Sequence, residues 1–124
     1  MVKPKLSRQQ LGQRAEQLAC DYLRSQGWQL VCTNYHCTGG EIDLVMSQGH
    51  ILACIEVRYR SSRAYGSALE SVSLTKQKKV LIAAQHFLHH HVQFQSFAVR
   101  FDVIAIQADA DGETLDWIPH AFSC

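Results

Sequence analysis

Residues 39–60 read GGEIDLVMSQGHILACIEVRYR, and this stretch predicts a β-hairpin that carries acidic side chains. In its first half Glu41 and Asp43 alternate with apolar residues, which is the period of a strand with one buried face. Gln48 and Gly49 then supply a glycine-containing reversal of the kind that joins antiparallel strands. The second half also alternates, so its charged residues share one face of the next strand: Glu56, Arg58 and Arg60. The two strands are therefore expected to place these charges beside Asp43.

The acids Asp43 and Glu56 suit a hard divalent cation. Mg²⁺ in proteins is usually held by one or two carboxylates, while water and substrate phosphate oxygens complete an octahedral shell. Such a metal polarises a phosphoryl oxygen and lowers the pKa of a bound water. Arg58 would then stabilise the charge that develops on the phosphate. An ordinary exposed strand face with a cross-strand ion pair accounts for the same spacing, so the spacing alone leaves both interpretations open.

Two motifs of the hairpin carry a family resemblance: Gly39-Gly40-Glu41-Ile42-Asp43-Leu44 and Ile55-Glu56-Val57-Arg58. They are similar to the core of the restriction-endonuclease-like nucleases, whose signature is an Asp followed by Glu-x-Lys on the next strand. Within that superfamily the chain most resembles the small YraN-like proteins, predicted nucleases of unsettled function that share a fold with archaeal Holliday-junction resolvases. The likeness runs over residues 11–106 and includes other matching residues: Gly12, Glu16, Ala19, Tyr65-Gly66, Lys76 and Arg100-Phe101-Asp102-Val103.

The resemblance implies a site, a cofactor and a substrate class. It implies Mg²⁺ or Mn²⁺ as the cofactor, Asp43 and Glu56 as metal-site acids, and Glu16 of the first helix as an auxiliary acid. The implied function is a metal-dependent nuclease-like protein that binds DNA, and the superfamily analogy extends this to branched or recombination and repair intermediates. Two other functions stay open: a nucleic-acid-binding module that has lost catalysis, and a protein-interaction domain.

Arg58 departs from the signature, because the family has Lys at this position. A guanidinium is planar and effectively always charged, whereas a buried Lys can lose its proton or direct a compact ammonium at an attacking water. We therefore expect metal and DNA binding to be retained and cleavage to be low.

Basic residues indicate where DNA would lie, although the formal net charge is only +1. Some follow the second hairpin strand, where they would contact phosphate or stack on a splayed base. Others occupy the first turns of the second predicted helix, a position that helix electrostatics disfavour unless an anion binds there. Simple solvation of these side chains remains the alternative. The candidates are Arg60, Arg63, Tyr65, Lys76, Lys78 and Lys79, and Lys76 is the first choice for a phosphate contact.

Periodicity and end signals predict an α/β fold with a restriction-endonuclease-like core, in which a mixed β-sheet is flanked by α-helices. The first helix is expected over residues 8–26, with Ser7 as N-cap, Gln10 completing a capping box and Gly27 ending it. The second helix is expected over residues 73–89. Strands are predicted over 28–34, in the two halves of the hairpin, over 95–107 and at the edge over 115–118, with a loop over 35–40.

Length and composition favour one domain over residues 1–124, with 1–6 flexible and 108–124 a peripheral C-terminal segment. No apolar run has the length of a membrane span, so the expected location is the cytoplasm, away from membranes. The five cysteines show no CxxC spacing, which favours reduced thiols over structural zinc. The histidines at 86 and 89–91 are more typical of a solvated helix end than of a metal site. A homodimer would suit symmetric cleavage of two strands and stays open.

Overall fold

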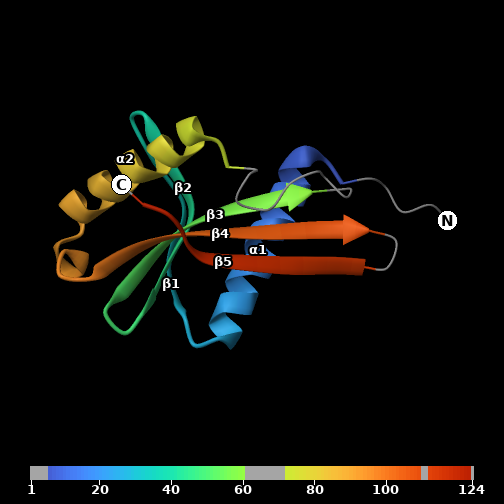
Figure 1. Cartoon of the computed structure of the whole chain (residues 1–124), viewed down its shortest axis with the longest axis horizontal. Coiled ribbons are helices and arrows are strands. Elements are labelled where there is room, and N and C mark those ends of the chain that lie inside the picture. The colour runs from blue at the N-terminus through green and yellow to red at the C-terminus, as the bar shows by residue number, and fades with distance from the viewer. Residues whose placement is uncertain (1–5, 61–71, 110–111, 124) are drawn as a thin grey trace.

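The structure, a computed structural model, describes residues 6–60, 72–109 and 112–123. Its centre is a five-stranded sheet in the order β1-β2-β3-β4-β5, in which β3 and β4 are parallel and every other pair is antiparallel (Figure 1). The strands are β1 Gln29–Cys37, β2 Gly40–Gln48, β3 Ile51–Arg60, β4 Ala98–Asp109 and β5 Gly112–Phe122. The helices are α1 Arg8–Ser25 and α2 Leu74–His90, followed by a short 3-10 helix, η2 Val92–Phe94.

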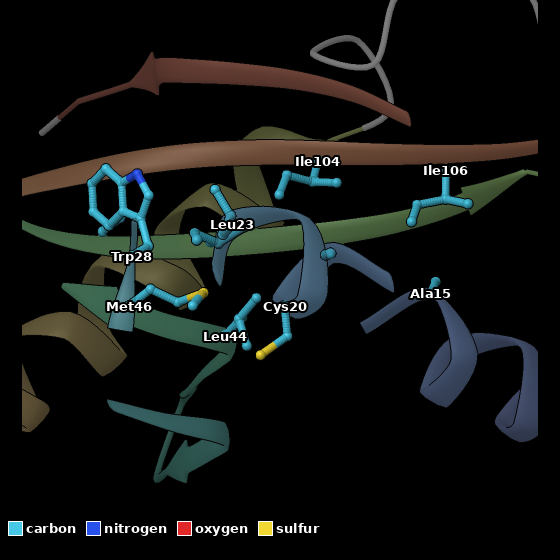
Figure 2. Packing of buried hydrophobic residues seen from close by; sticks show 11 residues of the cluster. Ala15, Cys20, Leu23, Trp28, Leu44, Met46, Ile104 and Ile106 are labelled. Atoms are coloured by element: carbon cyan, nitrogen blue, oxygen red, sulfur yellow. The ribbon is translucent and has the colours of Figure 1, made fainter. Parts of the chain in front are cut away.

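The two helices cover opposite faces of the sheet. Successive residues of the central strands point to opposite sides, so each face has its own buried core against one helix. On one face, α1 packs through Cys20 and Leu23 against a core that includes Leu44 (Figure 2). On the other, α2 packs through Phe87 against a core that includes Val45. Both faces of β3 are covered, and residues 52–55 are at most 1% exposed. This mixed sheet flanked by helices confirms the predicted α/β class and is the arrangement expected of a restriction-endonuclease-like core.

The predicted helix starts are confirmed. Ser7 caps α1 by accepting a hydrogen bond from the backbone of Gln10, whose side chain in turn accepts one from the backbone of Ser7. Ser73 caps α2 by accepting from the backbone N–H of Lys76 at 3.1 Å. No helix in the described ranges combines the length and the apolarity needed to cross a membrane.

The predicted loop over residues 35–40 is wrong, since β1 continues to Cys37 and meets β2 through a tight hairpin. Gly39 makes this turn with φ +80°, a conformation that L side chains rarely adopt. The next residue, Gly40, lies against α2: a Cβ there would stand 2.7 Å from both the backbone nitrogen of Ala83 and the carbonyl oxygen of Lys79. The start of β2 therefore packs directly against the backbone of α2. This contact fixes the distance between the acids of the hairpin and the side chains at the start of α2.

The C-terminal strand β5 is an edge strand, as predicted, but it is longer than the expected residues 115–118. Its pairing with β4 continues on both sides of an irregularity opposite Asp102. At its end Phe122 stacks on Phe101, with ring centroids 5.4 Å apart. The added length therefore buries aromatic surface that the sequence pattern did not assign to the core.

Candidate active site

Asp43 lies where two strands diverge. The pairing of β2 with β3 runs from Gln48 opposite Ile51 to Leu44 opposite Ile55, and Asp43 is the next residue along β2. Its Oδ2 accepts a hydrogen bond from the backbone N–H of Val57 at 2.9 Å. The carboxylate thus replaces the carbonyl that strand pairing would have supplied, and it is held beside the neighbouring Glu56.

Glu56 is a buried acid with an unsatisfied oxygen. The residue is 1% exposed, and its Oε2 has no hydrogen-bond partner within the described residues. When Glu56 is protonated, it can donate a hydrogen bond to the carboxylate of Asp43. Burial first, then this hydrogen bond and the negative charge of Asp43, raise the pKa of Glu56 to about 9. A buried carboxyl oxygen without a partner, next to a second carboxylate, is a position where a cation would relieve both the desolvation and the repulsion.

Lys76 of α2 supplies a cation to this acid. Its Nζ forms an ion pair with Glu41 and lies 3.5 Å from Oε1 of Glu56. Partial burial lowers the pKa of Lys76, but the hydrogen bond to Glu41 and the charges of Glu56 and Asp43 outweigh it, so the pKa is raised overall. The hydrogen bond from Lys76 also lowers the pKa of Glu41. Lys76 is therefore a charged member of the acidic cluster.

Glu16 reaches the same region from α1. Burial raises its pKa, the charge of Asp43 raises it further, and a hydrogen bond with the side chain of Asn34 opposes both effects. Asn34 itself has a positive φ of 51°, which is uncommon outside glycine. Glu16 is thus within electrostatic reach of Asp43, as its position on the helix suggested.

The residues present fit a cation that needs few protein ligands. Over residues 6–60, 72–109 and 112–123, no three His, Cys, Asp or Glu side chains converge closely enough to enclose a metal by themselves. Mg²⁺ commonly retains several waters and takes only one or two carboxylates from the protein. Asp43 and Glu56 can serve as such a pair, with Glu16 placed to act through water.

Arg58 lies two residues after Glu56 on β3, so both residues belong to the same face of the strand, as expected from alternation. It is paired with Ala105 of β4 and is partly exposed. Among the described residues, no ion pair joins Arg58 to Asp43 or Glu56, and the cation beside Glu56 is Lys76. The pattern missed this role of Lys76, because alternation along β3 points only to residues of the same strand.

Two of the other predicted DNA contacts, Lys78 and Lys79, follow Lys76 on α2. Lys78 and Lys79 are exposed, and Lys79 lies close enough to Glu41 to lower its pKa. Arg60 ends β3, but its side chain is outside the described part, as are Arg63 and Tyr65.

One cavity adjoins the candidate site, and a larger one lies away from it. One, of about 330 Å³, adjoins Glu16 and is lined by polar side chains that include Gln13, Arg24 and Asn34. The other, of about 580 Å³, lies at the β2–β3 turn and the end of α2, and no acid of the candidate site lines it. The chemistry of the acids, rather than the size of a cavity, therefore identifies the site.

Comparison with known proteins places the chain in a family. The model of the uncharacterised protein family UPF0102 matches residues 15–106. A UPF0102 protein of Saccharophagus degradans is 47% identical over 112 residues, which cover 90% of this chain and 92% of that protein. A UPF0102 protein of Nitrosococcus oceani is 41% identical over 121 residues, which cover 98% of this chain and 97% of that protein. The chain therefore belongs to the uncharacterised protein family UPF0102.

Proposed function

We propose that this protein is a metal-dependent DNA nuclease of the restriction-endonuclease-like superfamily, with Mg²⁺ or Mn²⁺ held by Asp43 and Glu56. The observation that carries the proposal is the buried Oε2 of Glu56, which lacks a partner in the described structure and stands beside a second carboxylate. A protein keeps such an arrangement at a cost to stability, so a functional cation is the simplest reason for it.

Each residue of the cluster has a chemical role in this proposal. The metal would supply Lewis-acid polarisation of the phosphate and a bound water of lowered pKa. The N–H of Val57 donates to Oδ2 of Asp43 and so orients this carboxylate toward the proposed metal position. The ammonium of Lys76 stabilises negative charge next to Glu56. The raised pKa of Glu16 makes it a better proton acceptor than an ordinary glutamate.

Lys76 also changes the expected effect of Arg58, which stands where the nuclease signature has Lys. The signature places an ammonium two residues after the Glu on the same strand, and here an ammonium approaches Glu56 from α2 instead. This supports catalysis in a chain that carries Arg58, whereas the sequence alone favoured low activity. Arg58 is then free to contact the DNA backbone through its planar guanidinium.

The test is a cleavage assay on linear duplex, single-stranded and four-way-junction DNA, each with Mg²⁺, Mn²⁺ or EDTA. We expect cleavage that requires metal and is lost in Asp43→Asn, a variant that keeps the acceptor for the N–H of Val57. If wild-type and Asp43→Asn proteins bind DNA equally and neither cleaves any substrate, the protein is a DNA-binding module. Such binding must weaken steeply with salt, because phosphate contacts release counterions.

A further inference from the structure

Two histidines of α2, His86 and His90, have their Nε2 atoms close together. His86 and His90 lie one turn apart on the helix, both exposed to solvent. Their Nε2 atoms are 3.1 Å apart, and their ring centroids are 4.2 Å apart with an interplanar angle of 70°. This contact is a hydrogen bond between the two imidazoles, with the donor set by the tautomers, so the two rings are already turned toward each other without a metal.

The separation of the two nitrogens matches that of neighbouring ligands on one metal ion. Imidazole nitrogens bind zinc at about 2.0–2.1 Å, which places two of them roughly 3.3 Å apart in a tetrahedral shell and roughly 2.9 Å apart at a right angle. The observed 3.1 Å lies between these values. A cation can therefore bind both Nε2 atoms with only small changes in the side-chain rotamers.

Tyr35 orients one of the rings from a different element. Its hydroxyl lies 2.5 Å from Nδ1 of His86, and its ring packs edge-on against Phe87 with centroids 5.2 Å apart. In the tautomer that has its proton on Nδ1, His86 donates to the Tyr35 oxygen and keeps the lone pair of Nε2 for a metal. A partner on the second ring nitrogen is the usual companion of a metal-binding histidine.

The state of His90 also suits a ligand. Desolvation by neighbouring groups first, and then the charges of His86, His89 and His91, lower the pKa of the exposed His90. His90 therefore remains neutral over a wider range of pH, and neutral imidazole is the form that binds metals.

We propose that His86 and His90 form a binding site for a borderline divalent cation of the zinc, nickel and copper class. In the part of the chain that is described, no third acidic, thiol or imidazole side chain completes the shell, so water would fill the other positions. This site is chemically distinct from the pair Asp43 and Glu56, because imidazole nitrogen favours zinc-class ions and carboxylate oxygen favours Mg²⁺. A cation there would link the last turn of α2 to β1 through Tyr35.

The test is calorimetric titration of the tag-free full chain with Zn²⁺ in a buffer that holds excess Mg²⁺. We expect one Zn²⁺ per chain, with affinity at least about tenfold lower in His86→Ala and in His90→Ala, since each removes one arm of a chelate. His89→Ala is the matched control, because His89 is an exposed histidine of the same turn, and it should bind as wild type does. Tyr35→Phe should bind more weakly than wild type by a smaller factor.

Two further measurements separate metal binding from loss of structure. Zn²⁺ should raise the thermal midpoint of the wild type and of His89→Ala but not that of His90→Ala, because only a native-state ligand stabilises. Bound Co²⁺ should give the visible absorption of nitrogen ligation only when both His86 and His90 are present. Equal Zn²⁺ affinity in wild type and His90→Ala, or no Zn²⁺ binding by wild type, would overturn the proposal.

Discussion

Nζ of Lys76 lies 3.5 Å from Oε1 of Glu56, across the contact between α2 and β3. The same ammonium forms an ion pair with Glu41, so one lysine from the first turn of α2 contacts an acid of β2 and an acid of β3. Neither acid is adjacent to Lys76 in the chain. The candidate site is thus assembled by the packing of α2 against the sheet.

Replacing this lysine should greatly slow the proposed DNA cleavage without abolishing DNA binding. We expect Lys76→Ala to lower the cleavage rate by about 10²–10³, the usual effect of removing one group that stabilises transition-state charge. Lys78→Ala is the matched control, because Lys78 is exposed and two residues away on the same helix. The control should cleave normally and bind DNA slightly less well. Cleavage by Lys76→Ala at the rate of wild type would contradict the assigned role.

Arg58→Lys creates the Glu-x-Lys signature of the nucleases that the hairpin resembles, and the position of Lys76 changes the effect that we expect of this substitution. From the sequence alone we expect this substitution to raise cleavage. With an ammonium already beside Glu56, we expect less than about a threefold change in rate, since a second cation adds little to charge already stabilised. Rates and DNA affinities are compared at the same salt and Mn²⁺ concentration. A large gain in rate would mean that Lys76 does not do the work of the signature lysine.

Asp43→Asn separates metal binding from structure. The amide oxygen can still accept the hydrogen bond from Val57, whereas Asp43→Ala leaves that N–H without a partner and costs about 1–3 kcal/mol. Calorimetry should show Mn²⁺ affinity at least about tenfold lower in Asp43→Asn, because a ligating charge is lost. Asp21→Asn, a change at an exposed acid of α1, is the control. Equal Mn²⁺ affinity in wild type and Asp43→Asn would remove Asp43 from the site.

Glu56→Gln should stabilise the metal-free protein at neutral and mildly alkaline pH. The pKa of Glu56 is raised from 4.5 to about 9, so the folded protein binds a proton that the unfolded chain releases. Its contribution to the free energy of unfolding is greatest below pH 4.5 and falls as the pH rises toward 9. In EDTA the thermal midpoint of Glu56→Gln should exceed that of wild type at pH 8 and match it near pH 5. Each kcal/mol of difference in the free energy of unfolding corresponds to a shift on the order of 5 °C.

Manganese should reverse this difference. Metal binding displaces the proton of Glu56, so Mn²⁺ should raise the midpoint of wild type at pH 8 and leave that of Glu56→Gln unchanged. A difference between the two proteins that stays constant from pH 5 to pH 8 would show that Glu56 does not titrate in this range.

Asp102 should be essential for stability. It is 0% exposed, accepts two hydrogen bonds from Arg100 at 2.9 Å each, and also accepts from Trp117 and from the backbone of His120. Asp102→Ala would leave the guanidinium of Arg100 without its charge partner between the rings of Trp28 and Trp117. We expect a loss of about 3–5 kcal/mol in the free energy of unfolding, measured by urea denaturation.

A surface pair supplies the control for this measurement. Arg14 and Glu113 form an ion pair whose side chains are 53% and 30% exposed. Exposed pairs contribute about 0–1 kcal/mol, so Glu113→Ala should scarcely change the urea midpoint. Similar losses for Asp102→Ala and Glu113→Ala would show that the buried network contributes little.

The local features of this fold could be predicted from the sequence. The capping box of Ser7 and Gln10 and the cap at Ser73 depend on residues within one turn of each other, and both are present. The hairpin also follows from a period of two around Gly49. The length of β1 could not be read in this way, because the alternation of residues 35–37 is too short to mark a strand, and these residues are stabilised by pairing with β2 and contact with α2.

The candidate site could be predicted only in part. The strand pattern identified Asp43 and Glu56, but alternation does not reveal where β2 stops pairing with β3, which decides what Asp43 contacts. The contact of Lys76 with Glu41 spans 35 residues of sequence, so only tertiary packing creates it. Likewise, the spacing of His86 and His90 is visible in the sequence, but the orientation of His86 depends on Tyr35, 51 residues away.

Because Gly40 lies so close to α2, substitution of this glycine should be as harmful as substitution of a residue of the candidate site. A methyl group at this position would meet backbone atoms of Lys79 and Ala83, which cannot rotate away, so the helix itself would have to move. Such a shift would change the distance between Lys76 and Glu56, because Lys76 lies on the same helix as Lys79 and Ala83, whereas Glu56 lies on β3. In a saturation screen for activity, substitutions at Gly40 should therefore group with substitutions at Lys76, and selection for activity should tolerate no other amino acid there.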